Sequence, residues 1–139
     1  MSKTDSDRYM KNEKQFNTWL RKQFYEHSNK KVCVQRIENT TTNGTFDILV
    51  ILSDKTLFIE SKYQTERLRP EQYAFQIRTN GIIKNNVTNF LTLSAYPKKN
   101  MFVLHQYNAS SITSDRFIPY KREEYELSKA GFQEFMESL

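Results

Sequence analysis

Two apolar runs separated by three polar residues constrain the fold of this 139-residue chain more than any other feature. Residues 45–52 read TFDILVIL and residues 56–63 read TLFIESKY, with Ser53, Asp54 and Lys55 between them. Both runs are rich in β-branched and aromatic residues, and the link is too short for a crossover between parallel strands. The sequence therefore predicts an antiparallel β-hairpin.

Each strand of this hairpin carries one acid, Asp47 in the first and Glu60 in the second. A two-residue turn at Ser53 and Asp54 would place the carboxylates directly opposite each other, whereas a longer turn would leave them diagonal neighbours. Facing like charges are unfavourable, and a divalent cation held by both carboxylates removes that conflict. In an alternative interpretation, both acids face solvent on an open sheet and Lys62 pairs with one of them.

The residues around the acids favour the first interpretation. Residues 48–51 (ILVI) are consecutively apolar, which is typical of strands covered on both faces. Side chains alternate along a strand, so Glu60 and Lys62 share one face. We therefore expect Asp47, Glu60 and Lys62 to form a partly buried polar cluster.

The rest of the chain shows further helical and strand patterns. Helical spacing is found in three segments, residues 9–27, 70–80 and 129–139. Strand patterns are found in four more, residues 31–38, 86–94, 100–107 and 117–120, although 86–94 also fits a helix. Residues expected at helix ends are Ser6 or Asp7, Gly81 and Ser128. This order indicates an α/β or α+β fold in a single domain.

Composition excludes several classes of protein. Hydrophobic residues make up 37% and aromatic residues 14%, with only 3 Gly and 3 Pro, which excludes collagen-like and low-complexity chains. The single cysteine, Cys33, excludes an internal disulfide and a cysteine-based zinc site, and favours a reducing compartment. No apolar run approaches the roughly 20 residues of a membrane-spanning helix, and the polar start does not resemble a secretory signal. We expect a soluble intracellular protein.

The net charge of +5 is unevenly distributed. Residues 1–36 have nine basic and four acidic side chains, residues 37–72 four and six, residues 73–120 five and one, and residues 121–139 three and five. A central acidic segment is thus enclosed by basic ones, as expected for a polyanion-binding surface around a cation site. On charge alone, an ordinary mixed surface explains the pattern equally well.

Three short motifs connect these features. GTFDILV at residues 44–50, FIESK at 58–62 and LRPEQ at 68–72 resemble the PD-(D/E)XK nuclease superfamily. Within it, the chain is most similar to stand-alone VRR-NUC nucleases of viral or phage type and to Holliday junction resolvase-like proteins. The resemblance covers roughly residues 9–94. Two positions depart from the family pattern, because Phe46 replaces a usual proline and Ser61 occupies a commonly apolar position.

The resemblance implies a restriction-endonuclease-like core of α/β (mixed α+β) class. The expected element order is αβββαβ, with a central mixed sheet flanked by helices. It also implies one nuclease domain over residues 1–139. Within it, residues 1–8 form a flexible start, 9–94 the core and 95–139 an additional strand and helix.

The resemblance also assigns roles to individual residues. Asp47 and Glu60 would bind Mg²⁺ or Mn²⁺ together with the backbone carbonyl of Ser61. Lys62 would orient or deprotonate the attacking water and stabilise charge on the phosphate. Two further residues complete the set. They are Gln72, which would lie near the scissile phosphate or the lysine, and Glu13, on the first helix. Glu13 shares the core-facing stripe of its helix, but it could equally be a solvent carboxylate paired with a nearby lysine.

The implied activity is that of a divalent-metal-dependent endonuclease that hydrolyses DNA phosphodiester bonds and is structure-selective, like a Holliday junction resolvase, in phage or viral DNA replication or recombination. The expected partner is branched or duplex DNA. A homodimer in the host cytoplasm is expected, without membrane or organic cofactor. Two alternatives remain open, a sequence-specific or nicking endonuclease of the same fold, and a catalytically silent binding module with an anti-defence role.

Candidate nucleic-acid contacts are basic or aromatic residues near these motifs or on the basic flanks. They are Lys14, Lys30, Lys31, Tyr63, Arg67, Arg69, Tyr73 and Arg78, with Lys84, Lys98 and Lys99 as further basic candidates. Taken singly, such lysines and arginines are also typical of ordinary surface, and the tyrosines of a core. His27 and His105 lack metal-ligand partners and are expected to be structural, and Cys33 is expected in the core.

Overall fold

The computed structural model describes residues 10–37 and 46–139. Its elements are α2 (Glu13–His27), β1 (Val32–Arg36), β2 (Ile48–Leu52), β3 (Thr56–Tyr63), α3 (Pro70–Ile82), β4 (Thr88–Tyr96), η1 (Pro97–Lys99), β5 (Met101–Gln106), η2 (Ala109–Ser111), β6 (Lys121–Glu126) and α4 (Lys129–Glu137). The first six described helices and strands, α2 to β4, follow the predicted αβββαβ order. No helix within the described residues is long and apolar enough to cross a membrane.

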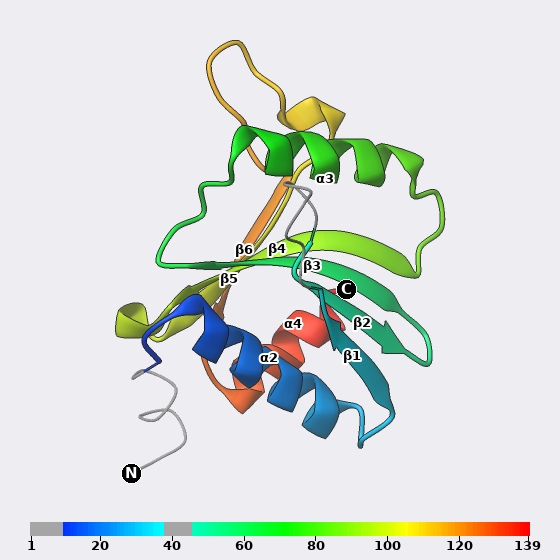
Figure 1. Cartoon of the computed structure of the whole chain (residues 1–139), viewed down its shortest axis with the longest axis vertical. Helices are drawn as coiled ribbons and strands as arrows, with labels where there is room; N and C mark the ends of the chain where they lie inside the picture. The colour runs from blue at the N-terminus through cyan, green and yellow to red at the C-terminus, as the bar shows by residue number, and fades with distance from the viewer. Residues whose placement is uncertain (1–9, 38–45) are drawn as a thin grey trace.

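The six strands form one mixed sheet in the order β1-β2-β3-β4-β5-β6. Strands β3 and β4 are parallel and connected through α3, while the other neighbouring pairs are antiparallel. Helix α3 covers one face of the sheet, and α2 and α4 cover the other (Figure 1). We call these the α3 face and the α2–α4 face. The predicted α/β class with a mixed sheet flanked by helices is confirmed.

The hairpin of β2 and β3 closes through the two-residue turn at Ser53 and Asp54, the first of the two turn lengths considered. Ile48 lies opposite Ile59 and Ile51 opposite Thr56, and the Leu52 amide donates to the Lys55 carbonyl at 2.8 Å across the two-residue turn. The prediction that both faces of β2 are covered is wrong at Ile51, which is 45% exposed. The α3 helix contacts β4 rather than β2, so this part of the α3 face stays open.

The apolar core lies on the α2–α4 face. Helix α2 contributes Phe16, Leu20 and Phe24, whose four-residue spacing places them on one side of the helix. Phe132 and Phe135 of α4 complete the same cluster, and all five side chains are at most 1% exposed. Aromatic packing between the two helices thus fixes them against the sheet, with the Phe24 and Phe132 ring centroids 4.9 Å apart.

His27, expected to be structural, and Cys33, expected in the core, are both at the surface. His27 ends α2 and is exposed, and its ring packs against that of Phe132 with centroids 6.0 Å apart. Cys33 is also exposed. Strand β1 is an edge strand in which Val32 and Val34 pack against the core, so the alternating Cys33 points outward.

Several element ends differ from prediction. Asn12 caps α2 by accepting from the Gln15 amide at 2.9 Å, whereas Ser6, Asp7 and the start at residues 1–8 lie outside the described residues. Gly81 is expected to end the helix, but α3 continues through Gly81 to Ile82. In segment 86–94, residues 88–94 belong to strand β4 and none is helical. Ser128 caps α4 as predicted, accepting from the Gly131 amide at 3.1 Å.

The short edge strand predicted at residues 117–120 is wrong. Phe117 forms only an isolated bridge with Ile112, and the edge strand is β6, which begins at Lys121. The sequence of β6 is KREEYE, and Tyr125 is its only buried residue. Because this strand pairs through its backbone and buries one side chain, it lacks the apolar alternation that identifies strands from sequence.

Candidate functional site

Three predicted residues interlock on the α3 face. Glu60 and Lys62 leave β3 on the same side, and Gln72 meets them from the first turn of α3. The Gln72 side-chain amide donates to Glu60 Oε1 at 2.6 Å, and Lys62 Nζ donates to Gln72 Oε1 at 2.9 Å. Lys62 Nζ also lies 3.9 Å from Glu60 Oε1. Gln72 therefore bridges the carboxylate and the ammonium and orients both.

The local sequence fixes Gln72 in this position. Pro70 begins α3, where a proline is preorganised for the first helical turn. Arg69 is the N-cap residue, and its backbone amide donates to Gln72 Oε1 at 2.9 Å in a capping box. The same glutamine oxygen thus accepts from the helix start and from Lys62, so the beginning of α3 and the lysine are positioned together.

Asp47 lies in a bend one residue before β2 and is therefore not paired with Glu60 in the regular ladder. Its Oδ2 accepts from the Ser61 amide at 2.9 Å, and the Ser61 hydroxyl lies 3.1 Å from the same oxygen. The Ser61 hydroxyl is also 3.1 Å from Glu13 Oε1 on α2, so its single proton serves one acceptor at a time. Ser61 is fully buried and links both carboxylates to β3.

Glu13, Asp47 and Glu60 are close enough for the negative charge of one carboxylate to make ionisation of another less favourable. Glu60 is only 4% exposed, and its burial, followed by the charge of Asp47, raises its pKa to about 8 despite the opposing Lys62. Burial, and then Asp47, also raises the pKa of Glu13. A bound cation would relieve both the burial of charge and the repulsion.

The polar atoms of the site fit a divalent cation. Glu60 Oε2 is buried and has no hydrogen-bond partner in the described part of the chain. The available donors are carboxylate and carbonyl oxygens, which Mg²⁺ and Mn²⁺ prefer. No three His, Cys, Asp or Glu side chains among residues 10–37 and 46–139 are already gathered around one point. Glu13 approaches from the α2–α4 face and Glu60 points to the α3 face, so Asp47, Glu60 and the Ser61 carbonyl are the donor set to consider.

The predicted nucleic-acid contacts fall into two groups. Arg67 and Arg69 lie in the loop that leads to Gln72, and the charge of Arg69 partly offsets the rise that burial causes in the pKa of Glu60. Lys14 is exposed beside Glu13 at the start of α2. Arg78 is exposed further along α3. Arg69 and Lys14 are thus next to residues of the site, Arg67 lies in the same loop as Arg69, and Arg78 lies six residues after Gln72 on α3.

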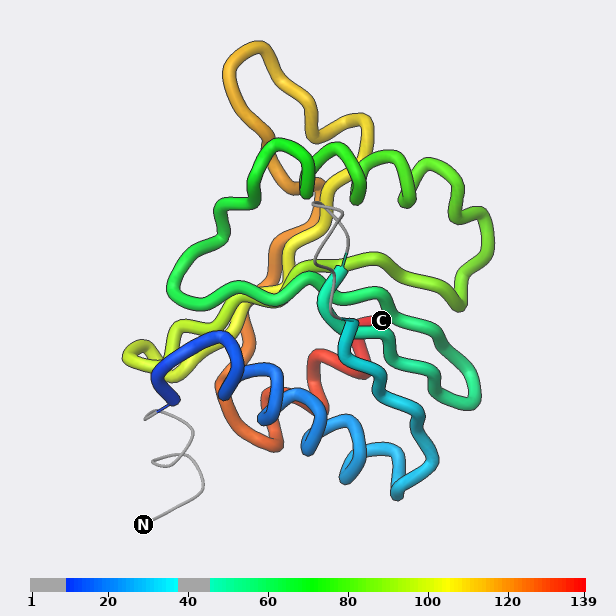
Figure 2. The backbone as a smooth tube through the Cα atoms, viewed as in Figure 1, coloured from blue at the N-terminus to red at the C-terminus, as the bar shows by residue number. Residues whose placement is uncertain are grey.

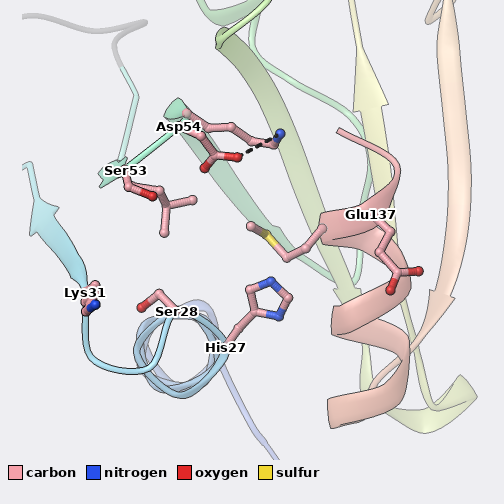
Figure 3. Close-up of a pocket in the computed structure, with 9 residues that line it drawn as sticks. His27, Ser28, Lys31, Ser53, Asp54 and Glu137 are labelled. Carbon is pink, nitrogen blue, oxygen red and sulfur yellow. Dashed lines mark ion pairs between the residues drawn. The ribbon is translucent and has the colours of Figure 1, made fainter.

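Lys30 and Lys31 lie elsewhere, in the turn after α2. Lys31 lines a cavity of about 290 Å³ together with Ser53 and Asp54 of the hairpin turn and Glu137 of α4 (Figure 3). The hairpin turn is at the opposite end of β2 and β3 from Asp47 and Glu60. The structure therefore does not bring these two lysines to the candidate site.

Both predicted tyrosines pack against protein. Tyr63 donates from its hydroxyl to the Met10 carbonyl at 2.9 Å and packs on the apolar core. Tyr73 lies ring to ring with Phe117, with centroids 4.3 Å apart and planes inclined by 13°. Tyr63 is therefore held by contacts within the protein, whereas Tyr73 also lines an open groove beside Arg67.

A second polar network was not expected from the sequence. Arg122 of β6 donates to Glu66 through Nε at 2.6 Å and Nη2 at 3.1 Å, and the Tyr96 hydroxyl donates to Glu66 at 2.8 Å. This network ties the loop before α3 to β4 and β6. No local pattern reveals it, because Glu66 and Arg122 are 56 positions apart.

Family models and curated proteins give no match to this chain. Among solved structures, the chain is similar to Hjc, a Holliday junction resolvase of the archaeal hyperthermophile Archaeoglobus fulgidus. The identity is 15%, the match covers 74% of this chain and 87% of that one, and the TM-score is 0.47. A function for this chain is therefore inferred from its own side-chain geometry.

Proposed function

We propose that this chain is a divalent-metal-dependent endonuclease that hydrolyses DNA phosphodiester bonds. The observation that carries the proposal is the interlock of Glu60, Gln72 and Lys62 next to Asp47. It combines a buried carboxylate that has an unpartnered oxygen with an ammonium group held at a defined position. Cleavage of a phosphodiester needs both features, a site for a cation and a positive charge near the attacking water.

Asp47, Glu60 and the Ser61 carbonyl would hold Mg²⁺ or Mn²⁺, with Glu13 assisting from α2. When bound, such a cation supplies a Lewis acid that offsets charge on the phosphate and favours ionisation of water. The protein holds these donors on two adjacent residues of one strand and on the bend beside them. Their relative positions therefore depend on the hairpin rather than on mobile loops.

Lys62 would act on the attacking water and on the phosphate. Its side chain is 17% exposed, and Gln72 holds its Nζ by a hydrogen bond. As an ammonium, Lys62 is a compact point charge that would orient the attacking water and offset charge on the phosphate, whereas only its neutral amine form would deprotonate the water. Gln72 is a positioning residue in this scheme, because it contacts Lys62 and Glu60 and orients both.

We further propose a structure-selective, Holliday junction resolvase-like activity in phage or viral DNA replication or recombination. Arg67, Arg69 and Lys14 would contact backbone phosphates near the carboxylates, which gives affinity without sequence readout. A symmetric junction presents two related strands, so a homodimer would place one site on each. One nuclease domain over the whole chain, working in the cytoplasm, completes this proposal.

The test is cleavage of labelled DNA in Mg²⁺ or Mn²⁺, using a four-way junction, a flap, a nicked duplex, an intact duplex and a single strand. The Asp47→Asn variant should lose cleavage at least about 100-fold, because one carboxylate of the cation site is removed. Asp54→Asn is the matched control, since Asp54 lies exposed in the hairpin turn.

The outcomes separate the proposed activities. Paired symmetric incisions in the four-way junction alone support a resolvase, whereas cutting at one sequence or on one strand supports a sequence-specific or nicking enzyme. DNA binding without cleavage in either metal would support the silent binding module. Cleavage by Asp47→Asn at the wild-type rate would contradict the assigned site.

A further inference from the structure

A groove of about 510 Å³ lies beside the candidate site. One wall is the loop before α3 with the first turn of that helix, including Arg67, Leu68 and Tyr73. The opposite wall is residues 113–117, including Arg116 and Phe117. This segment extends beyond α3 at the top of the molecule (Figure 2). The volume is in the range of small-molecule sites, about 300–1,000 Å³.

The outer wall is a well-defined ribbon. The Ile118 amide donates to the Ser111 carbonyl at 2.9 Å, and Ile112 forms a bridge with Phe117. At the tip, the Thr113 amide donates to the Arg116 carbonyl and the Arg116 amide donates to Thr113 Oγ1, both at 3.1 Å. These bonds close a tight turn, so Arg116 and Phe117 project from a fixed backbone.

The groove has a flat aromatic wall. Tyr73 and Phe117 stack nearly parallel on each other with centroids 4.3 Å apart, so a base can stack only on a ring face that the partner ring does not cover. Tyr107 packs edge to face against Tyr73 at a centroid distance of 4.9 Å. The Tyr73 hydroxyl accepts from the Leu68 amide at 3.2 Å, which fixes the ring. Preorganised aromatic rings of this kind are stacking platforms for nucleic-acid bases.

Positive charge is available at both walls. Arg67 and Arg116 are exposed, and neither forms an ion pair with a carboxylate in the described parts of the chain. The neighbouring Arg69 and Arg122 do form such pairs, with Glu71 and with Glu66 and Glu124. Asp115 also lines the groove and accepts from Thr113 Oγ1 at 3.3 Å. Two guanidinium groups and one carboxylate leave the groove net positive.

We infer that this groove binds one unpaired nucleotide of a single-stranded DNA segment, with the base on the face of Phe117 that Tyr73 does not cover and the phosphates near Arg67 and Arg116. The inference rests on the proposed function, because the same loop connects the groove to Gln72. A base in a duplex is already stacked and paired, so only an unpaired or extruded base can enter. The groove would therefore select DNA with an unpaired nucleotide next to the cleavage site.

The probe is a single-stranded DNA oligonucleotide that contains 2-aminopurine, a base whose fluorescence is quenched by stacking. Binding is titrated in EDTA, so the measurement does not depend on cleavage. Wild-type protein should quench the probe. Arg116→Ala should weaken binding about 10-fold, because it removes one phosphate contact. Phe117→Leu keeps an apolar side chain but should lose most of the quenching.

Arg21→Ala is the matched control, because Arg21 is exposed on α2 at the other face of the sheet. Thermal unfolding of each variant shows whether the ribbon substitutions alter folding. Equal affinity and quenching for Arg116→Ala, Phe117→Leu and Arg21→Ala would overturn the groove assignment. Quenching that depends on Arg116 and Phe117 in a protein that never cleaves DNA would uphold the groove and overturn the nuclease proposal alone.

Discussion

The two faces of the central sheet are built from different chemistry. On the α2–α4 face, the buried contacts are aromatic and aliphatic, as in the packing of Phe24 and Phe132. On the α3 face, buried polar side chains occupy the centre, among them Gln76, Thr92 and His105. Gln76 donates to Thr92 at 2.8 Å, and His105 lies 2.8 Å from the Ser94 hydroxyl.

This difference separates stability from positioning. Apolar burial is non-directional and stabilises the fold in proportion to the area removed from water. Hydrogen bonds contribute less net stability, but they are directional and expensive to leave unmade. The α3 face therefore fixes Glu60, Lys62 and Gln72 at defined distances, while the α2–α4 face holds the sheet together.

Among changes on the apolar face, Phe132→Ala should lower the free energy of unfolding most. Phe132 is 1% exposed and contacts the rings of Trp19, Phe24 and Phe135, so its loss leaves a cavity between α2, α4 and the sheet. We expect the free energy of unfolding to fall by about 3–5 kcal/mol. Urea unfolding followed by Trp19 fluorescence measures it. Gln133→Ala on the exposed side of α4 is the control, and an equal loss there would contradict the comparison.

Lys62→Ala tests the polar face. We expect the DNA cleavage rate to fall about 100- to 1,000-fold, because the positive charge next to the attacking water is removed. The free energy of unfolding should change far less than in Phe132→Ala. Single-turnover cleavage and urea unfolding give the two values, with the exposed Lys22→Ala as the control. A large loss of stability without loss of cleavage would reverse the roles of the two faces.

The buried His105 should make the α3 face sensitive to acid. Burial lowers the pKa of His105 to about 4, so the folded protein resists a proton that the unfolded chain accepts near pH 6.5. Stability is therefore retained above pH 6.5 and lost as the pH falls towards 4. Between pH 7 and 5, His105 should account for about 2 kcal/mol of this loss.

Urea unfolding of wild type and His105→Gln at both pH values measures the contribution of His105. The variant should show a smaller decrease between pH 7 and 5, whatever its stability at pH 7. His27→Gln is the matched control, since His27 is exposed. An unchanged decrease in His105→Gln would show that His105 does not respond to pH as its burial implies.

The smallest expected effect is stabilisation by Mn²⁺. A cation that binds the folded state at a concentration several-fold above its dissociation constant adds about 1 kcal/mol, or roughly 3 °C in Tm. Glu60→Gln should abolish the increase, whereas Glu26→Gln on the exposed side of α2 should retain it. Thermal unfolding with and without Mn²⁺ provides the measurement. The same increase in both variants would place the binding elsewhere.

Much of the fold could be predicted because its signals are local. The hairpin follows from apolar alternation and a short polar link, and the α2 stripe follows from three- and four-residue spacing. The predictions failed where tertiary contacts replace such signals. Strand β6 buries only Tyr125, and Cys33 is exposed because β1 is an edge strand.

The candidate site shows the same division. The sequence placed Glu60 and Lys62 on one face and located Gln72 at the start of a helix. It did not reveal that Asp47 leaves the ladder to accept from the Ser61 amide, because a bend at a strand end depends on its neighbours. It also did not separate Lys30 and Lys31 from the carboxylates, since distance between surface residues is a property of the folded sheet.

The sequence by itself determined most of the elements, the hairpin and the residue types of the candidate site, because these depend on interactions among near neighbours along the chain. Only the tertiary structure decided that α3 delivers Gln72 between Glu60 and Lys62, and that a ribbon from the C-terminal third faces Tyr73 across a groove. Both contacts join segments that are brought together by the β3–α3–β4 crossover and by the packing against it. Whether such segments come into contact depends on the summed burial and hydrogen bonding of the whole sheet.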